Sequence, residues 1–406
     1  MTTRFVASRE EGLRRLESFV PRAGADYRSK HHLARSSQGE TGVSELSPYL
    51  SHRLITESEV VRAVLAEHRP DRVEPFFQEF CRRTYWKGWL EGRPQVFDHW
   101  KRLRVEDGRR WPERDDYQKA VTASTGIDAF DFWVKELKDT GYLHHKARMY
   151  FASIWIFTLK LPWSLGASFF MNHLLDGDAA SNTLSWRSVA GIQKKGNTFL
   201  ATPDSIREFT RGEFFPKAQL ALHASSVAGA PTPNYSSPLS FPFQPSEQLG
   251  DEYALLLTGD DLSPEDGALG KLKPKLILSL DPEDFHNAFD LSETVLEYKR
   301  AALQDAVKRA EVHFSCPSLV LRTKEDGARI LGEVMGAKGL KSLVYFEPFV
   351  GPWKTLTSQL SSRDVGVRYF PLRRPWDALL HPHAAKGYVS FKKQALPQII
   401  RARGRF

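Results

Sequence analysis

The sequence predicts a chain of two unlike domains, an all-α domain followed by an α/β Rossmann-like domain with a parallel sheet. Three observations support this fold class. Residues 1–215 carry apolar residues at helical spacing and no convincing strand. Residues 216–250 contain many prolines, and proline suits neither a helix interior nor a strand interior. This composition predicts a Pro/Ser-rich linker. In residues 251–406 short apolar runs alternate with helical segments, a pattern typical of parallel strands with helices on both faces.

Four helices are expected ahead of the central stretch of the chain. They lie at Phe5–Phe19, Glu57–Glu67, Val73–Leu90 and Asp115–Leu137, the last with an interruption at Thr125-Gly126. Residues 93–116 contain Pro, Gly and many charges and predict a loop. The Val73–Leu90 helix interleaves basic and aromatic side chains, as a nucleic-acid surface requires. Core rings with solvated charges are the alternative explanation of that pattern.

The α/β domain is expected to alternate strands with helices. Strands are predicted at Tyr253–Leu257, Leu276–Leu280, Pro317–Leu321, Ser342–Phe346 and Val365–Phe370. Helices are predicted at Leu291–Val312, Asp326–Met335 and Thr355–Ser362. No GxGxxG motif follows the first strand, so the dinucleotide-binding fingerprint is absent.

Composition predicts a soluble globular protein. The 406 residues are 41% apolar and 26% charged, and the net charge of +8 suits an anionic partner such as nucleic acid, although a merely basic protein fits it equally well. Cys81 and Cys316 are the only cysteines, which excludes a four-Cys metal site and fits a reducing, cytoplasmic compartment. The N-terminal residues lack the apolar core of a signal peptide. The most apolar run, Tyr150–Leu161, is too short to span a membrane.

The stretch from Thr140 to Trp186 holds the strongest candidate site. It is apolar and aromatic, breaks at Pro162, resumes as a helix, and ends in a polar turn at Asp176–Asp178. An acidic, Gly-containing turn that closes a buried helix pair can hold a polar ligand in an apolar core. Upstream, Thr41–Leu50 is rich in hydroxyls, and Ser44 and Ser47 are natural N-cap residues for the helix that follows. A helix start of this kind also suits a phosphate.

Several motifs resemble, in order, the flavin-binding domain of the photolyase/cryptochrome family. Thr140–His144 (TGYLH) is similar to the family's TGWMH, and Leu174–Asp178 (LLDGD) is similar to its LIDGD. Gly42–Leu50 is similar to the phosphate-binding segment GTSRLSPYL. Glu79 and Arg83 fall in the family's ELxWRxFY helix. The likeness extends over most of the all-α domain.

The resemblance implies an FAD held in a U shape, with its adenine folded back toward the isoalloxazine ring. It assigns to the cofactor Tyr27, Val43, Ser44, Glu45, Leu46, Ser47, Arg83, Arg148, Asp176, Gly177, Asp178 and Asn182. Arg148 would pair with Asp176, and Asn182 would face the flavin N5. Val43 and Glu45 stand where the family has Thr and Arg. A buried carboxylate needs a cation or donors to stay ionised; a turn that only caps a helix is the alternative.

The predicted substrate side departs from the family pattern. Arg82 replaces the Trp on which the family stacks a DNA lesion, and His145 replaces an Asn. Animal-type (6-4) repair enzymes have a His at the position of His145 and another at that of Met149, so one of their two catalytic histidines is present. Glu79, Arg82 and His145 are expected to line the lesion pocket. A polar pocket-lining role is the alternative for His145.

Family members reduce their flavin by light through a chain of tryptophans. Trp186 and Trp163 stand at the proximal and middle positions of that chain, and Ala120 stands where its terminal Trp is expected. Trp155, Trp133 or a tyrosine could take the outer place. Packing in the core is the alternative role of Trp186 and Trp163.

The predicted α/β domain follows the flavin domain, whereas the family's α/β antenna domain usually precedes it. Gly387–Lys393 is faintly similar to the segment that ends the antenna domain. A permuted domain order is therefore our hypothesis, and an unrelated Rossmann-like domain is the alternative. The hypothesis leaves room for a second, antenna chromophore of unknown type, for which the sequence assigns no residue.

Three functions follow from the resemblance. The leading one is a blue-light-absorbing FAD flavoprotein in which reduced flavin passes an electron to a pyrimidine lesion in single- or double-stranded DNA, which would make the chain a DNA photolyase (a lyase). The second is a cryptochrome-like photoreceptor without repair activity, which would act on a signalling partner. The third is a light-independent flavoprotein. Neither a metal ion nor a membrane partner is expected.

Overall fold

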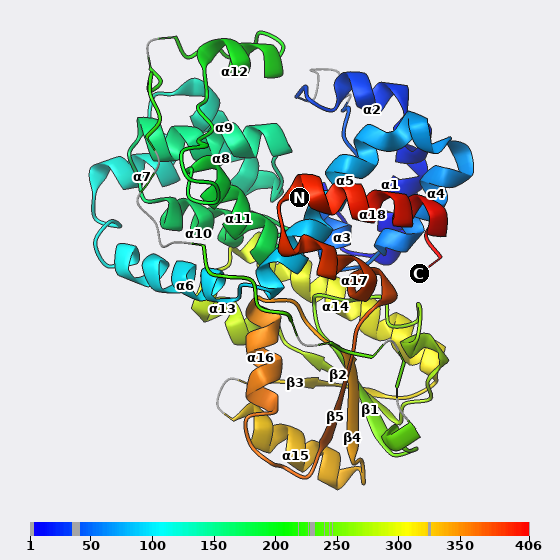
Figure 1. Cartoon of the computed structure of the whole chain (residues 1–406). Helices are drawn as coiled ribbons and strands as arrows, with labels where there is room; N and C mark the ends of the chain where they lie inside the picture. The colour runs from blue at the N-terminus through cyan, green and yellow to red at the C-terminus, as the bar shows by residue number, and fades with distance from the viewer. Residues whose placement is uncertain are drawn as a thin grey trace.

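Helices form one end of the molecule and a sheet with its own helices forms the other (Figure 1). The computed structural model describes residues 4–405 except 35–40, 218, 226, 228–231, 239, 243, 246, 324 and 325. An all-α domain followed by an α/β domain with a parallel sheet confirms the predicted fold class.

The helices of the first domain follow the apolar stripes of the sequence. They are α1 (Arg9–Phe19), α2 (Ala25–Lys30), α3 (Ser47–Ser51), α4 (Glu57–Glu67), α5 (Pro70–Glu91), α6 (Gln95–Gly108), α7 (Asp115–Val121), α8 (Asp128–Thr140), α9 (His145–Ser153), α10 (Trp163–His173), α11 (Ala179–Val189) and α12 (Pro203–Phe209). Local chemistry sets their ends. Thr56 and Glu59 form a capping box at the start of α4, and Gly141, with a φ of 66°, ends α8.

The loop predicted at residues 93–116 is wrong, because most of it is helix α6. Val96, Phe97 and Trp100 fall on one face of α6 and are buried. The charged residues between them point outward, and their number hides a helical spacing that the apolar residues do carry.

The sheet contains five parallel strands in the order β3-β2-β1-β4-β5. They are β1 (Tyr253–Leu257), β2 (Leu276–Leu280), β3 (Ser318–Leu321), β4 (Ser342–Phe346) and β5 (Arg368–Leu372). Helices lie between these strands along the chain: α13 (Glu283–Phe289), α14 (Glu293–Phe314), α15 (Gly327–Ala337) and α16 (Pro352–Leu360). β5 begins later than predicted, because Gly366, with a φ of 74°, interrupts the extended chain ahead of it.

The strand order reverses between β1 and β4, so a crevice lies beyond their carboxyl ends. Helix α14 contacts β2 on one side and α1 and α10 of the helical domain on the other, and Figure 1 shows it between the two parts. The crevice therefore faces the helical domain.

The chain returns to the helical domain after β5. Helices α17 (Pro375–Leu380) and α18 (Tyr388–Ala402) lie against α5 (Figure 1, red). Trp376 Nε1 donates to Thr84 Oγ1 over 3.0 Å, which fixes α17 to α5. The predicted division at residues 1–215, 216–250 and 251–406 stays a prediction. Within the described ranges, none of the helices is long and apolar enough to cross a membrane.

Candidate functional site

The polar turn between α10 and α11 closes a buried helix pair. Leu175 N donates to Gly141 O over 2.9 Å, which ties the turn to the end of α8. A β-carbon on Gly141 would lie 2.5 Å from the Leu175 side chain, so this approach requires glycine. Asp178 then caps α11, since its carboxylate accepts a hydrogen bond of 2.6 Å from Ser181 N.

Both carboxylates of the turn lie against cations. Arg148 donates two hydrogen bonds to Asp176, of 3.1 and 2.9 Å. Asp178 Oδ2 lies 3.5 Å from Lys87 Nζ and 3.7 Å from Arg83 Nη1. Burial by itself raises the pKa of each carboxyl, but the neighbouring cations outweigh it and lower both pKa values below the usual range. Both groups are therefore ionised at neutral pH.

Three buried polar atoms beside this turn have no hydrogen-bond partner among the described residues. They are Oδ1 of Asn182, Nη1 of Arg83 and Nζ of Lys87. The Asn182 amide is oriented by its Nδ2, which donates to Ala167 O over 2.7 Å. A buried polar atom without a partner costs about 1–3 kcal/mol. The acceptor without a hydrogen bond, together with two cations that pair with Asp178 without hydrogen-bonding to it, fits a polar ligand that offers both an N–H and carbonyl or phosphate oxygens, as a flavin nucleotide does.

The hydroxyl-rich segment enters α3 beside the same turn. Helix α3 begins at Ser47, and its N-cap is Leu46, without a side-chain cap. The predicted capping role of Ser47 is therefore wrong, and its hydroxyl instead helps to lower the pKa of Asp176. Ser44 Oγ accepts a bond of 3.4 Å from Leu46 N. The segment and the polar turn are thus in direct contact.

Glu45 stands in this segment with a φ of 54° and a buried side chain. It forms ion pairs with Arg4 and Arg15. The two arginines neutralise a carboxylate whose charge would otherwise oppose a phosphate. Val43, its neighbour in the segment, is also buried.

A column of rings connects Tyr27, a predicted cofactor residue, with His145 on the side predicted to face a lesion. Tyr27 stacks on His31 with 4.7 Å between ring centroids, and His31 lies parallel to His145 at 6.5 Å. Burial lowers the pKa of His145 to about 3, and the neighbouring His31 adds to the effect. His145 is therefore uncharged at neutral pH. Sequence reasoning missed His31, although its place one helical turn after Tyr27 could have pointed to it.

Arg82 and Glu79 pair with each other on α5. Arg82 Nε donates to Glu79 over 2.8 Å. The Arg82 guanidinium lies 4.6 Å from the ring centroid of Tyr388 on α18, and the Tyr388 hydroxyl donates to Gln78 O. Helix α18 thus covers part of the predicted lesion side. No sequence signal connects Tyr388 with α5.

The two predicted electron carriers lie at different places in the core. Trp186 follows Asn182 by one turn of α11 and is fully enclosed. Its ring centroid lies 6.2 Å from that of Trp155. Trp163 begins α10 and is also buried, but the described residues show no ring contact between Trp163 and Trp186.

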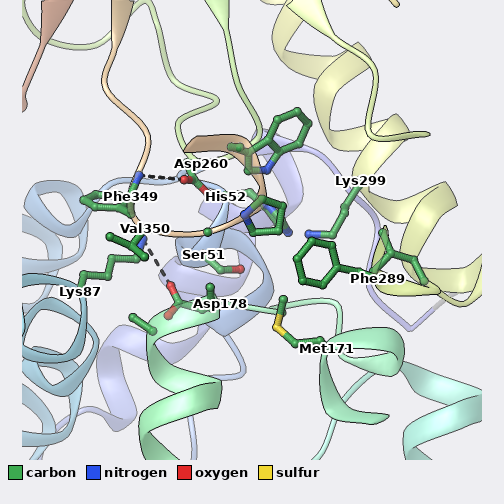
Figure 2. Close-up of a pocket in the computed structure, with 17 residues that line it drawn as sticks. Ser51, His52, Lys87, Met171, Asp178, Asp260, Phe289, Lys299, Phe349 and Val350 are labelled. Carbon is green, nitrogen blue, oxygen red and sulfur yellow. Dashed lines mark hydrogen bonds and ion pairs between the residues drawn. The ribbon is translucent and has the colours of Figure 1, made fainter. Parts of the chain in front are cut away.

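A pocket opens where the helical domain meets the crevice of the sheet (Figure 2). Asp260 and Phe349 come from the loops that follow β1 and β4, and Phe349 N donates to Asp260 over 3.1 Å. Lys299 of α14 reaches into it from the other side, as Figure 2 shows. Gly177 and Asp178 are the predicted site residues that line it.

Two ionisable groups in this pocket have pKa values shifted far from their usual values. Burial raises the pKa of Asp260 to about 6 and lowers the pKa of Lys299 to about 8. Lys87 lies 4.0 Å from the ring centroid of Phe349. In the part of the chain that the structure describes, no cluster of three or more His, Cys, Asp or Glu could hold a metal ion.

Comparison with known proteins finds similarity in the helical part of the chain. A family model described as the FAD binding domain of DNA photolyase matches residues 76–210. Deoxyribodipyrimidine photo-lyase of Synechococcus sp. is 31% identical over 186 residues, which are 43% of this chain and 36% of that protein. The protein of the same name from Vibrio cholerae is 26% identical over 174 residues, 42% of this chain and 37% of its own length. This chain spans less than two fifths of the length of these two relatives.

Two solved structures are also similar. A bacterial class III photolyase from Agrobacterium tumefaciens has a TM-score of 0.41 and 23% identity, covering 50% of this chain and 44% of its own. A cryptochrome from Synechocystis sp. has a TM-score of 0.44 and 21% identity, covering 51% and 44%. The family match contains α5 from residue 76 on, the polar turn and Trp186, and it ends ahead of the sheet.

Proposed function

Because this chain belongs, through its helical domain, to the photolyase/cryptochrome family, we propose that it is a blue-light-absorbing FAD flavoprotein that passes an electron to a pyrimidine lesion in DNA. The observation that carries the proposal is the free Oδ1 of Asn182 beside the ion pair of Arg148 and Asp176. Bound FAD would supply light absorption and one-electron chemistry.

The residues of the chain would hold and orient that cofactor. The Asn182 Oδ1 would accept a hydrogen bond from a flavin ring N–H, and Arg83 would donate to its oxygens. The segment from Val43 to Ser47 would hold the phosphates, with Tyr27 near them. Gly177 would let the turn approach the ligand, because no side chain projects there.

Purification tests the flavin part of the proposal. The protein should be yellow, release FAD on denaturation, and bleach at 450 nm (roughly the flavin maximum, a property of the cofactor) under blue light with a thiol. Asn182→Ala should retain less FAD than the wild type, because it removes the free acceptor. A colourless protein that takes up no FAD would refute the proposal, and FAD binding without bleaching would favour a light-independent flavoprotein.

If the chain repairs lesions, as proposed, its partner is DNA. The net charge of +8 suits a polyanion, and the relatives at 26% and 31% identity are both named deoxyribodipyrimidine photo-lyase. Oligonucleotides that carry either a cyclobutane dimer or a (6-4) lesion, single- or double-stranded, should be restored under blue light and not in the dark. Failure on every substrate would contradict repair while leaving the flavin proposal intact.

A cryptochrome-like photoreceptor is the second candidate, and two observations favour it. Arg82 is already paired with Glu79 and lies against Tyr388, so the lesion side is partly covered. His145 is uncharged and cannot donate the proton of an imidazolium at neutral pH. In that case light should bleach the flavin and change the protease sensitivity of the chain, with no repair.

We also propose the pocket at the crevice of the sheet as the place of a second, antenna chromophore. It lies at the reversal of strand order, where open α/β sheets bind ligands, and Lys299 faces it (Figure 2). Chromophores released from the purified protein should then include one besides FAD, and Lys299→Met should lose it while FAD remains. A cytoplasmic location and the permuted domain order stay parts of the proposal.

A further inference from the structure

A row of redox-active rings leads from the polar turn toward the surface. Trp186, one turn from Asn182, meets Trp155 at 6.2 Å between centroids with an interplanar angle of 83°. Trp155 meets Tyr117 of α7 at 5.9 Å and 86°. Trp155 and Trp186 are almost completely buried, whereas Tyr117 is half-buried. The row therefore begins at the candidate flavin site and ends where solvent has access.

A glycine permits the first of these contacts. A β-carbon on Gly166 of α10 would lie 2.3 Å from Trp186 Cη2 and 3.0 Å from Trp155 Nε1. The two indoles and the α10 backbone therefore occupy the space that a side chain would fill. Electron exchange between rings falls steeply with distance, so this close packing favours it.

The two indole N–H groups differ in a way that gives the row a direction. Trp186 Nε1 is buried and has no hydrogen-bond partner among the described residues. An oxidised Trp186 would thus keep its proton and its charge, and would remain a strong oxidant. Trp155 Nε1 donates to Pro162 O over 2.9 Å. A carbonyl acceptor stabilises positive charge on the donor ring, so oxidation is easier at Trp155 than at Trp186.

Tyr117 can end the row because it can lose a proton when it loses an electron. Its phenol is fully protonated at neutral pH, since burial raises its pKa and the nearby Asp290 adds to the effect. Oxidation makes the phenol strongly acidic, and its half-buried position lets the proton reach water. The resulting neutral radical does not oxidise Trp155 again at once.

We propose that Trp155 and Tyr117 carry electrons from the surface to Trp186, so that Trp155 rather than Trp163 is the ring that serves Trp186. The inference rests on the proposed flavin function. After Trp186 has given one electron to the excited cofactor, an electron from Trp155 fills the vacancy. Tyr117 then reduces Trp155 and releases its phenolic proton, and a thiol in solution returns one electron and one proton to Tyr117.

The test compares Trp155→Phe, Tyr117→Phe, Trp163→Phe and Trp186→Phe, each adjusted to the same bound FAD. Trp100→Phe is the matched control, because Trp100 is equally buried and its Nε1 also donates to a carbonyl, Ser164 O at 3.1 Å. Blue-light bleaching with a thiol should slow by about tenfold or more in Trp155→Phe, as an added barrier of about 1.4 kcal/mol would do. Trp100→Phe should keep the wild-type rate.

A spectroscopic readout identifies the carrier independently of the bleaching rate. Freeze-trapped, illuminated wild type should show a tyrosyl radical by electron paramagnetic resonance, whose hyperfine splitting narrows with ring-deuterated tyrosine. Tyr117→Phe and Trp155→Phe should both lack that signal. The inference is overturned if Trp155→Phe bleaches as fast as Trp100→Phe, or if Trp163→Phe alone is slow. A wild type without bound FAD, or a Trp186→Phe variant that bleaches normally, would instead refute the flavin function or its electron entry.

Discussion

Arg148 shows how much the buried charge of the polar turn depends on one residue. Its two hydrogen bonds occupy both oxygens of Asp176, and the fully buried carboxylate stays ionised because of them. The motif order in the sequence was enough to predict this pair. It could not show that the Ser47 hydroxyl also lowers the pKa of this carboxyl, because residues 47 and 176 are far apart in the sequence.

Replacing Arg148 by methionine should lower the free energy of unfolding by about 3–5 kcal/mol, because it leaves the Asp176 carboxylate buried without its cation. Urea denaturation of the flavin-free protein at neutral pH measures the change. Arg114→Met is the control, since its pair with Asp116 is exposed to solvent and should contribute little to stability. Equal effects of the two substitutions would show that Asp176 is not a buried ion.

Asp260 should make stability fall as pH rises. Its pKa is raised to about 6 in the folded state, above the value of about 3.9 for an unfolded Asp. The folded chain therefore holds a proton that the unfolded chain has released between these values. The associated stability is complete below about pH 4 and is lost as pH rises through about 6.

Asp260→Asn removes that titration and keeps an acceptor for Phe349 N. The variant should match the wild type near pH 4 and be the more stable of the two at pH 7. Urea midpoints at both pH values measure this. A difference that is the same at both values would contradict the raised pKa.

At the scale of single elements, the clearest predictions from sequence were strands that are buried on both faces. β1, β2 and β4 begin and end where the sequence predicts, because each is a continuous apolar run between turns. Helix α6 was missed because charges outnumber its few buried residues. The sequence pattern thus predicts an element well when most of its residues are apolar and buried. It fails when a few buried residues on one face are sufficient to hold a helix whose other residues are charged.

Helix α10 should tolerate no side chain at Gly166. An alanine there would gain helix propensity, but its β-carbon would collide with Trp186, so Gly166→Ala should cost about 1–3 kcal/mol. Gly336→Ala in α15 is the matched control, because nothing lies within 4 Å of its added carbon, and it should stabilise by about 0.4–1 kcal/mol. Thermal denaturation of both variants measures the contrast. Stabilisation by both would mean that the indole can move aside freely.

At the scale of the whole molecule, a buried ionic network joins its parts. Arg53, from the helical domain, bonds Asp377 of α17 at 2.7 and 2.8 Å and Asp261 of the β1 loop at 3.3 Å. Asp261 in turn accepts bonds of 2.6 and 2.8 Å from Arg374. Sequence could not predict this network, because its members are separated by as many as 324 positions.

Arg53→Met should destabilise the chain by about 3–5 kcal/mol, since Asp377 stays buried without the cation that bonds both of its oxygens. It should also separate the unfolding of the two domains, which tryptophan fluorescence and circular dichroism in urea would record as non-coincident transitions. Arg363→Met, which removes only an exposed pair with Asp326, should leave one transition of nearly unchanged midpoint. A single unshifted transition in Arg53→Met would mean that the network does not couple the domains.

The position of α18 on α5 has a consequence for synthesis. A ribosome completes α5 long before it completes α18, and the whole sheet is made in between. One side of α5 in the nascent helical domain therefore stays uncovered until the α/β domain and then α18 have been synthesised. During that interval the exposed rings beside Arg82 would be a natural target for chaperones, and a flavin could enter from a side that the finished protein closes.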